Sequence, residues 1–181
     1  MKNLNKLFYI SILIVTAFMI NGCNPFDELY LTLAMETRFE TIAPVSNVAL
    51  TNSICLSEFD DYNDNSDKLT EIRYISAAYF TLSSSNGLTG DLRLKLYQGN
   101  TNILLFDFTD ATFEADLYLN KPLKINLSQQ EIDNLNSYLT NPKVDKCFRA
   151  ELEVLNANDN DGAPFQLNGK VEFLTELQIE P

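Results

Sequence analysis

Apolar and polar residues alternate along most of the chain beyond residue 28. A period of two places every second side chain on the same face, so these segments are predicted to be strands with one buried face. In the clearest run, 165–179, most odd-numbered residues are apolar. For 27–38 a helix is the alternative, because the composition also suits one. Strands are predicted at 29–40, 48–56, 72–82, 91–98, 103–108, 113–119, 123–127, 147–155 and 165–179.

One short helix is predicted near 129–139. Ser128 and Glu131 form a capping box, in which the serine oxygen accepts from the amide three residues later and the glutamate reaches back. Ile132, Leu135 and Leu139 then recur at helical spacing, as in a helix with one face packed on a core. An Asn-Pro dipeptide follows and ends the pattern.

The pattern predicts a mainly β protein. Gly99–Asn102 is a turn signal that predicts a hairpin between 91–98 and 103–108, and a second, longer hairpin is predicted from 147–155 and 165–179. About eight strands with one apolar face each require two sheets packed face to face. We therefore expect one domain at 29–181, an antiparallel β-sandwich of immunoglobulin-like or jelly-roll type. A lipocalin-like β-barrel is the alternative.

The first 23 residues form a different kind of segment. Lys2 and Lys6 precede Leu7–Ile20, which is apolar apart from a serine and a threonine and is too short for the roughly 20 residues of a membrane span. The run Ile20-Asn21-Gly22-Cys23 follows. This segment resembles the signal peptide and lipobox of bacterial lipoproteins. The alternative is an ordinary signal peptide or signal anchor with an incidental cysteine.

The resemblance implies a processing pathway and a location. Residues 1–22 would be removed as a signal peptide, and Cys23 would carry a diacylglycerol and, on its new amino group, an acyl chain such as palmitate. Residues 23–28 would form a lipidated tether. The domain would then lie in the bacterial cell envelope, with the outer membrane favoured, facing either the periplasm or the cell surface. Two or three acyl chains anchor a protein stably.

Composition excludes several functional classes. The formal net charge is −12, and becomes −14 once the leader with its two lysines and no acid is removed. Such a charge repels nucleic acid, so we expect no nucleic-acid partner. The chain has no histidine, the usual general base and the commonest metal ligand. No nucleophile motif is present either, so we expect a protein that is not an enzyme.

Cys55 and Cys147 remain once Cys23 is assigned to the lipid. Both lie on predicted strands in the phase opposite their apolar neighbours, and an exported protein folds under oxidising conditions. We therefore predict a disulfide between them. Two unrelated thiols are the alternative.

An acidic segment, 58–71, is predicted to be a loop. Within it Asp61, Asn63, Asn65 and Asp67 have the every-other-residue spacing of the first half of an EF-hand calcium loop. The match then fails, because serine stands where that loop has glycine and isoleucine where it has glutamate. Ca²⁺ at these four residues is the one cofactor the sequence raises, and a solvated loop is the alternative.

Three functions remain open. The leading one is a membrane-anchored, non-catalytic binding domain for a glycan or protein partner; for a glycan, Tyr62, Tyr97 and Tyr118 would have to cluster on one face. The second is a structural subunit of a cell-surface assembly, joined by strand addition at a sheet edge. The third is a hydrolase that uses a pair of carboxylates.

Overall fold

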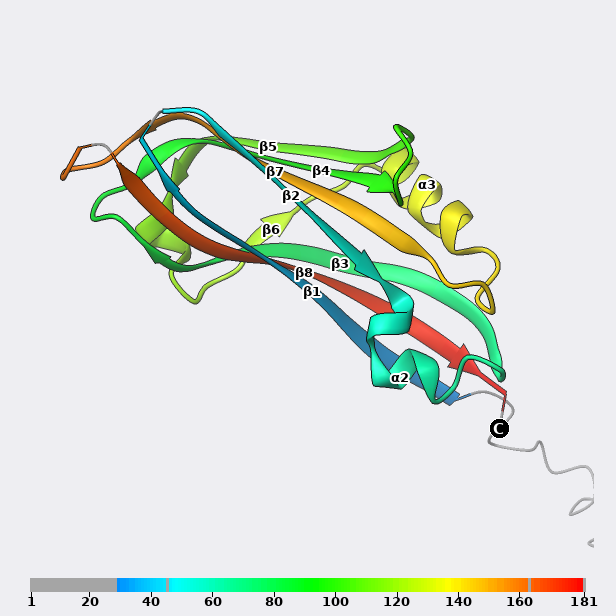
Figure 1. Cartoon of the computed structure of the whole chain (residues 1–181). Helices are drawn as coiled ribbons and strands as arrows, with labels where there is room; N and C mark the ends of the chain where they lie inside the picture. Colours follow the sequence, from blue (N-terminus) through cyan, green and yellow to red (C-terminus); the bar gives the residue numbers. More distant parts are fainter. Residues whose placement is uncertain (1–28, 45, 163, 181) are drawn as a thin grey trace, which may run out of the picture.

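The computed structural model describes residues 29–44, 46–162 and 164–180, and within them two four-stranded antiparallel sheets pack face to face (Figure 1). Sheet A contains, in spatial order, β1 (Leu29–Ala43), β8 (Phe165–Ile179), β3 (Leu69–Ser84) and β6 (Leu123–Ile125). Sheet B contains β2 (Val48–Cys55), β7 (Cys147–Asn158), β4 (Thr89–Gln98) and β5 (Leu104–Glu114).

The strand pairing is that of a jelly roll. β1 pairs with β8, β2 with β7, β3 with β6 and β4 with β5, as if one long hairpin of eight strands had been wrapped into a sandwich. The pairs β3–β8 and β4–β7 complete the two sheets. The predicted β-sandwich is thus confirmed in its jelly-roll form. The lipocalin-like barrel is wrong, because the two sheets are separate and each ends in two edge strands.

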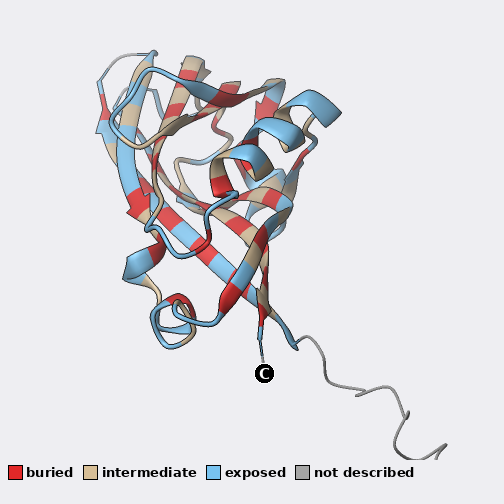
Figure 2. Cartoon of the chain, turned by 90° about the vertical axis from the view of Figure 1, so that its right-hand side faces the viewer, coloured by how far each residue is buried: buried red, intermediate tan, exposed pale blue. Residues whose placement is uncertain are grey.

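The core lies between the sheets and follows the predicted alternation. In Figure 2 buried and exposed bands alternate along the strands. β8 is the clearest case, since every odd-numbered residue from Phe165 to Ile179 is buried. The same alternation of burial is found in β1, which contains the described part of 27–38. That segment is therefore a strand and not the helix considered as the alternative.

The predicted helix is confirmed as α3 (Gln129–Leu139). Ser128 and Glu131 form the capping box, and Leu135 and Leu139 are its buried residues. The helix lies along the side of the sandwich, beside β3 and β5, where the three-residue β6 leaves most of β3 uncovered (Figure 1). α3 therefore protects a long strand edge that β6 is too short to pair.

Two predictions about strands are wrong. Residues 113–119 do not form a strand of their own: β5 runs to Glu114, and Ala115–Tyr118 is a 3-10 helix. Leu117 and Leu119 remain exposed, and the segment pairs with β3 through a single bridge, from Leu119 to Thr81. β7 and β8 do not form a hairpin, because the chain crosses from sheet B to sheet A between them.

The acidic segment is not a simple loop. A 3-10 helix, Leu56–Glu58, is followed by α2 (Asp60–Asn63), and β3 begins at Leu69. Leu56 and Tyr62 are buried, so these turns close one end of the sandwich.

One close contact in sheet A requires glycine. Tyr79 of β3 is fully buried, and its ring lies directly over Gly169 of β8. A Cβ at position 169 would lie 2.4 Å from the Tyr79 hydroxyl oxygen. Burial raises the pKa of Tyr79 to about 12. The glycine therefore makes room for a large aromatic side chain in the centre of the core.

Candidate functional site

A pocket of about 390 Å³ lies on the outer face of sheet A, over β3, β6 and β8. The register places Ala78 of β3 between Glu172 of β8 and Lys124 of β6. Ser76 and Ala78 are small, and they leave a hollow between these longer side chains. The sequence carried one signal of this site, the run of three small residues at 76–78 inside a strand, which the period-two analysis does not detect.

The walls of the pocket combine apolar and charged groups. Phe80 and Leu174 supply apolar surface, and Lys124 and Glu172 line the same hollow. The Lys124 side chain makes no ion pair, hydrogen bond or cation–π contact within the described part of the chain. A cation without a partner next to apolar surface is a group that a ligand can engage.

A short network of charges borders the pocket. The Lys170 ammonium lies 2.8 Å from a Glu36 carboxylate oxygen, 3.2 Å from a Glu172 oxygen and 5.2 Å from the centre of the Phe80 ring. Hydrogen bonding to Lys170 lowers the pKa of Glu36, and the same hydrogen bond raises the pKa of Lys170. Both groups are therefore charged at neutral pH.

The outer face of sheet B has a different character. Arg93 donates through Nε to Asp107 over 2.7 Å and through Nη2 to the other carboxylate oxygen. Glu153 accepts from Lys95 at 2.8 Å and lies 3.8 Å from Arg93. The hydrogen bonds from Arg93 lower the pKa of Asp107. These charges neutralise one another across β7, β4 and β5, and leave no unpaired cation among them.

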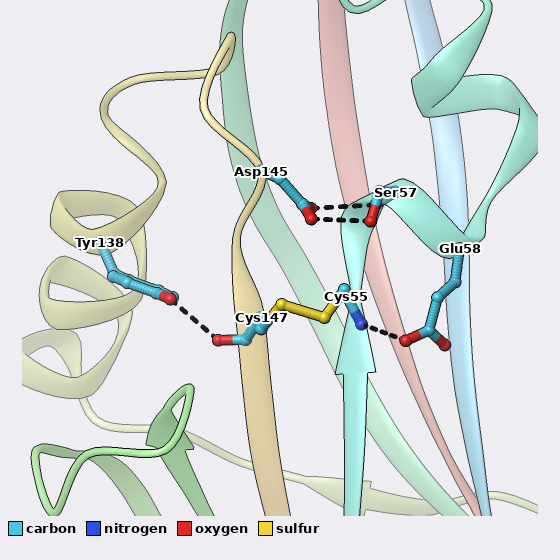
Figure 3. The surroundings of a disulfide bond; sticks show 6 residues. All are labelled: Cys55, Ser57, Glu58, Tyr138, Asp145 and Cys147. Carbon is cyan, nitrogen blue, oxygen red and sulfur yellow. Dashed lines mark hydrogen bonds between the residues drawn. A yellow bond between two sulfur atoms is a disulfide. The ribbon is translucent and has the colours of Figure 1, made fainter.

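The predicted disulfide is present. The β2–β7 register places Cys55 opposite Cys147, and the two sulfur atoms are bonded (Figure 3). Ser57 donates its amide and its hydroxyl to Asp145, and Tyr138 donates its hydroxyl to the Cys147 carbonyl at 2.8 Å. The Asp145 carboxylate lies close to both sulfurs, but sulfurs bonded to each other cannot act as thiolate ligands of a metal ion.

The four candidate calcium ligands lie in and after α2. Asn63 donates its side-chain amide to the Ser57 carbonyl, and Asn65 donates to the Asp61 carbonyl at 2.9 Å. Asp67 follows in the turn before β3. Within the described ranges, no group of three acidic ligand atoms gathers here. The helical turn directs alternate side chains apart, whereas the EF-hand analogy assumes a loop that wraps around the ion. The calcium site stays a prediction.

The three candidate tyrosines do not form a single platform. Tyr62 is buried and donates to the Pro142 carbonyl at 3.1 Å. Tyr97 is covered by the guanidinium of Arg149, 4.1 Å from its ring centre. Tyr118 lies in the 3-10 helix after β5 and stacks on Phe113, a core residue of β5. A glycan-stacking surface built from all three is therefore wrong.

The predicted lipid site, Cys23, and the leader lie outside the described residues. Among the helices that are described, none has the length and apolar character needed to cross a membrane.

The comparisons with known proteins find similar structures but no family. No protein-family model matches the sequence, and no curated protein matches it. The chain is similar to a solved structure of tobacco necrosis virus, with TM-score 0.43 and 10% identity over 86% of this chain and 84% of that one. A structure of Mud crab tombus-like virus gives TM-score 0.43 and 14% identity, covering 89% and 86%.

A third similar structure is the VP2 subviral particle of infectious bursal disease virus. Its TM-score is 0.36, with 12% identity over 88% of this chain. The chain spans 36% of the length of that VP2 chain.

Proposed function

We propose that this protein is an exported bacterial lipoprotein, anchored through Cys23, whose jelly-roll domain binds a protein or glycan partner without catalysing a reaction. The observation that carries the binding role is the pocket on the outer face of sheet A, with the unpaired Lys124 at its wall. The anchor rests on the resemblance of residues 1–23 to a lipoprotein signal sequence.

The chemistry of the two outer faces supports this choice of surface. A pocket of about 390 Å³ is within the range of about 300–1,000 Å³ typical of ligand sites. Burying its apolar wall is favourable, and Lys124 offers one charge for orientation. On sheet B a partner would have to desolvate ion pairs that already satisfy one another, which costs free energy.

The composition supports a non-catalytic role. The chain has no histidine to act as a general base near neutral pH. Glu36, at the border of the pocket, is held by Lys170, and this hydrogen bond lowers the pKa of Glu36. A carboxylate engaged by an ammonium is stabilised in its charged form, which disfavours the raised pKa that a general acid needs.

The anchor is tested by metabolic labelling with a palmitate analogue. We expect the label in the wild-type protein and none in the Cys23→Ala variant, which should also leave the membrane fraction. A membrane-bound, labelled Cys23→Ala protein would contradict lipidation at this residue.

The binding surface is tested with one bulky substitution on each sheet. Ala78→Trp fills the pocket, and Thr51→Trp places the same side chain on the exposed outer side of β2 as the matched control. We expect photo-crosslinking from position 76 to a defined envelope partner to fall at least about tenfold in Ala78→Trp, equivalent to about 1.4 kcal/mol of binding, and to be unchanged in Thr51→Trp. Equal loss in both, or in neither, would remove the pocket from the proposal.

A further inference from the structure

The two sides of β1 carry main-chain groups of different residues. The Leu33 carbonyl accepts from Thr175 of β8, so the odd-numbered residues of β1 direct their N–H and C=O groups towards β8. The Arg38 carbonyl instead accepts from the side chain of Asn52 in β2, so even-numbered residues direct theirs to the free edge. Main-chain groups therefore alternate between a paired side and an unpaired side.

The edge of β1 is covered at Arg38 and open between Thr32 and Glu36. Asn52 covers the edge at Arg38, and positions 38 and 40 carry charged residues. Leu29–Met35 contains no charge, no proline and no bulge. Within the described part of the chain, no hydrogen bond from another segment reaches the outward main-chain groups of Thr32, Ala34 or Glu36. Such an edge is a template for another strand.

Other edges of the sandwich are covered at defined points. Asn136 of α3 accepts from the Tyr74 amide on the β3 edge, and the Asn120 amide donates to the Thr81 carbonyl farther along the same strand. Glu131 accepts from the Asp107 amide on the edge of β5. β2 has only eight residues, a length that itself limits pairing. Among these edges, we select the segment from Thr32 to Glu36 of β1 as the site for strand addition.

We propose that the strand added at this edge is β1 of a second copy, running antiparallel about a two-fold axis at Ala34. This register places Ala34 opposite the partner's Ala34 and Thr32 opposite the partner's Glu36. The three even-numbered residues with free main-chain groups then pair fully, because Ala34 is their midpoint. On the inner side Leu33 faces the partner's Met35, so apolar meets apolar. No like charges face each other between positions 31 and 37.

The net charge of the domains weakens this contact, and anchoring both copies in one membrane strengthens it. Each copy carries −14 after loss of the leader, so the two domains repel each other beyond the neutral edge. Screening by salt therefore favours the dimer, the opposite of what an interface built on ion pairs would show. Confinement to one membrane raises the effective concentration, a step that rests on the proposed lipid anchor.

Cysteine crosslinking of the full chain tests both the contact and its register. Opposed residues of a hydrogen-bonded antiparallel pair have Cα atoms about 5.5 Å apart, which suits a disulfide. In proteoliposomes we expect Ala34→Cys to form covalent dimers at least about tenfold faster than Thr32→Cys, whose two copies would lie about 14 Å apart. Thr32→Cys mixed with Glu36→Cys should crosslink. Equal rates for Ala34→Cys and Thr32→Cys would overturn the proposal.

Two further variants separate this inference from the anchor and from misfolding. Ala34→Pro removes an outward N–H without touching the β8 ladder, and an edge strand tolerates proline there. We expect this variant to keep the thermal unfolding midpoint of the wild type and to lose association. Ala34→Cys in a Cys23→Ser chain, at high concentration in solution, should still crosslink, more in higher salt. A failed palmitate label would then contradict the anchor alone, whereas absence of crosslinking in solution and on vesicles would contradict the dimer.

Discussion

The two sheets of the sandwich share an inner design and differ on their outer faces. Both bury every second residue against the other sheet. Outside, sheet B carries cross-strand ion pairs centred on Arg93 and Glu153, and a disulfide ties β2 to β7. Sheet A has the ion pairs of Lys170 with Glu36 and Glu172, and in addition small residues, a pocket beside Ala78 and open main-chain groups at Thr32–Glu36 of β1.

This difference suggests that the outer face of sheet B serves stability and that of sheet A serves recognition. Groups that satisfy one another across a sheet gain little from a partner, since each must first be desolvated. Small side chains, an unpaired lysine and open main-chain groups leave interactions for a partner to complete. We therefore expect substitutions in sheet B to change mainly stability and substitutions on the outer side of sheet A to change mainly association.

The largest expected effect is in sheet B. Replacing both cysteines, Cys55→Ser with Cys147→Ser, should lower the free energy of unfolding by about 4 kcal/mol, because the bond closes a loop across 92 residues of separation. Urea denaturation measures this, with the wild type under a dithiol reductant as the control. A loss below about 1 kcal/mol would mean that the disulfide is not what holds sheet B together.

The next effect concerns the inner side of sheet A. Gly169→Ala should cost about 2 kcal/mol or more, because the new Cβ meets the Tyr79 ring in a fully packed core. The backbone at Gly169 is not in the left-handed region, so the cost arises from space alone. Combining it with Tyr79→Leu should remove most of that extra cost in a double-mutant cycle. Additive effects would show that the contact is not the cause.

A smaller effect tests the ion pairs of sheet B. Asp107→Asn should cost about 0.5–1 kcal/mol at neutral pH, since the pair is partly exposed. The folded-state pKa of Asp107 lies below its ordinary value of 3.8, so its contribution is present above about pH 4 and is lost as pH falls through the folded pKa. Urea midpoints from pH 7 to pH 3 should therefore converge for variant and wild type at the acid end.

The smallest expected effect is on the outer face of sheet A. Lys170→Met should change stability by less than about 0.5 kcal/mol, because its partners Glu36 and Glu172 are both partly exposed to solvent. Lys95→Met, whose lysine and Glu153 are both more buried, should cost more. Thermal unfolding midpoints of the two variants measure this. A larger loss of stability in Lys170→Met than in Lys95→Met would contradict the proposed difference between the two faces.

Local elements were predictable where their signals lie within a few residues. The capping box at Ser128 and the helical spacing after it predicted α3, and period-two runs predicted most strands. The same local signal misled at Leu117 and Leu119, which alternate like a strand, whereas their segment forms a 3-10 helix and a single bridge to β3. The pocket was missed because it depends on which strands flank Ala78, not on its neighbours in sequence.

The sequence by itself determined the mainly β class, the position of the helix and the pairing candidates among three cysteines, and the charge and the missing histidine led to expectations about function. Tertiary structure alone decided that β7 and β8 belong to different sheets, that Tyr62 is buried, and that an unpaired lysine, small side chains and a free edge lie on sheet A. Alternation specifies which side of a strand is buried. It does not specify the strand's neighbours, because those contacts depend on how distant segments fit together.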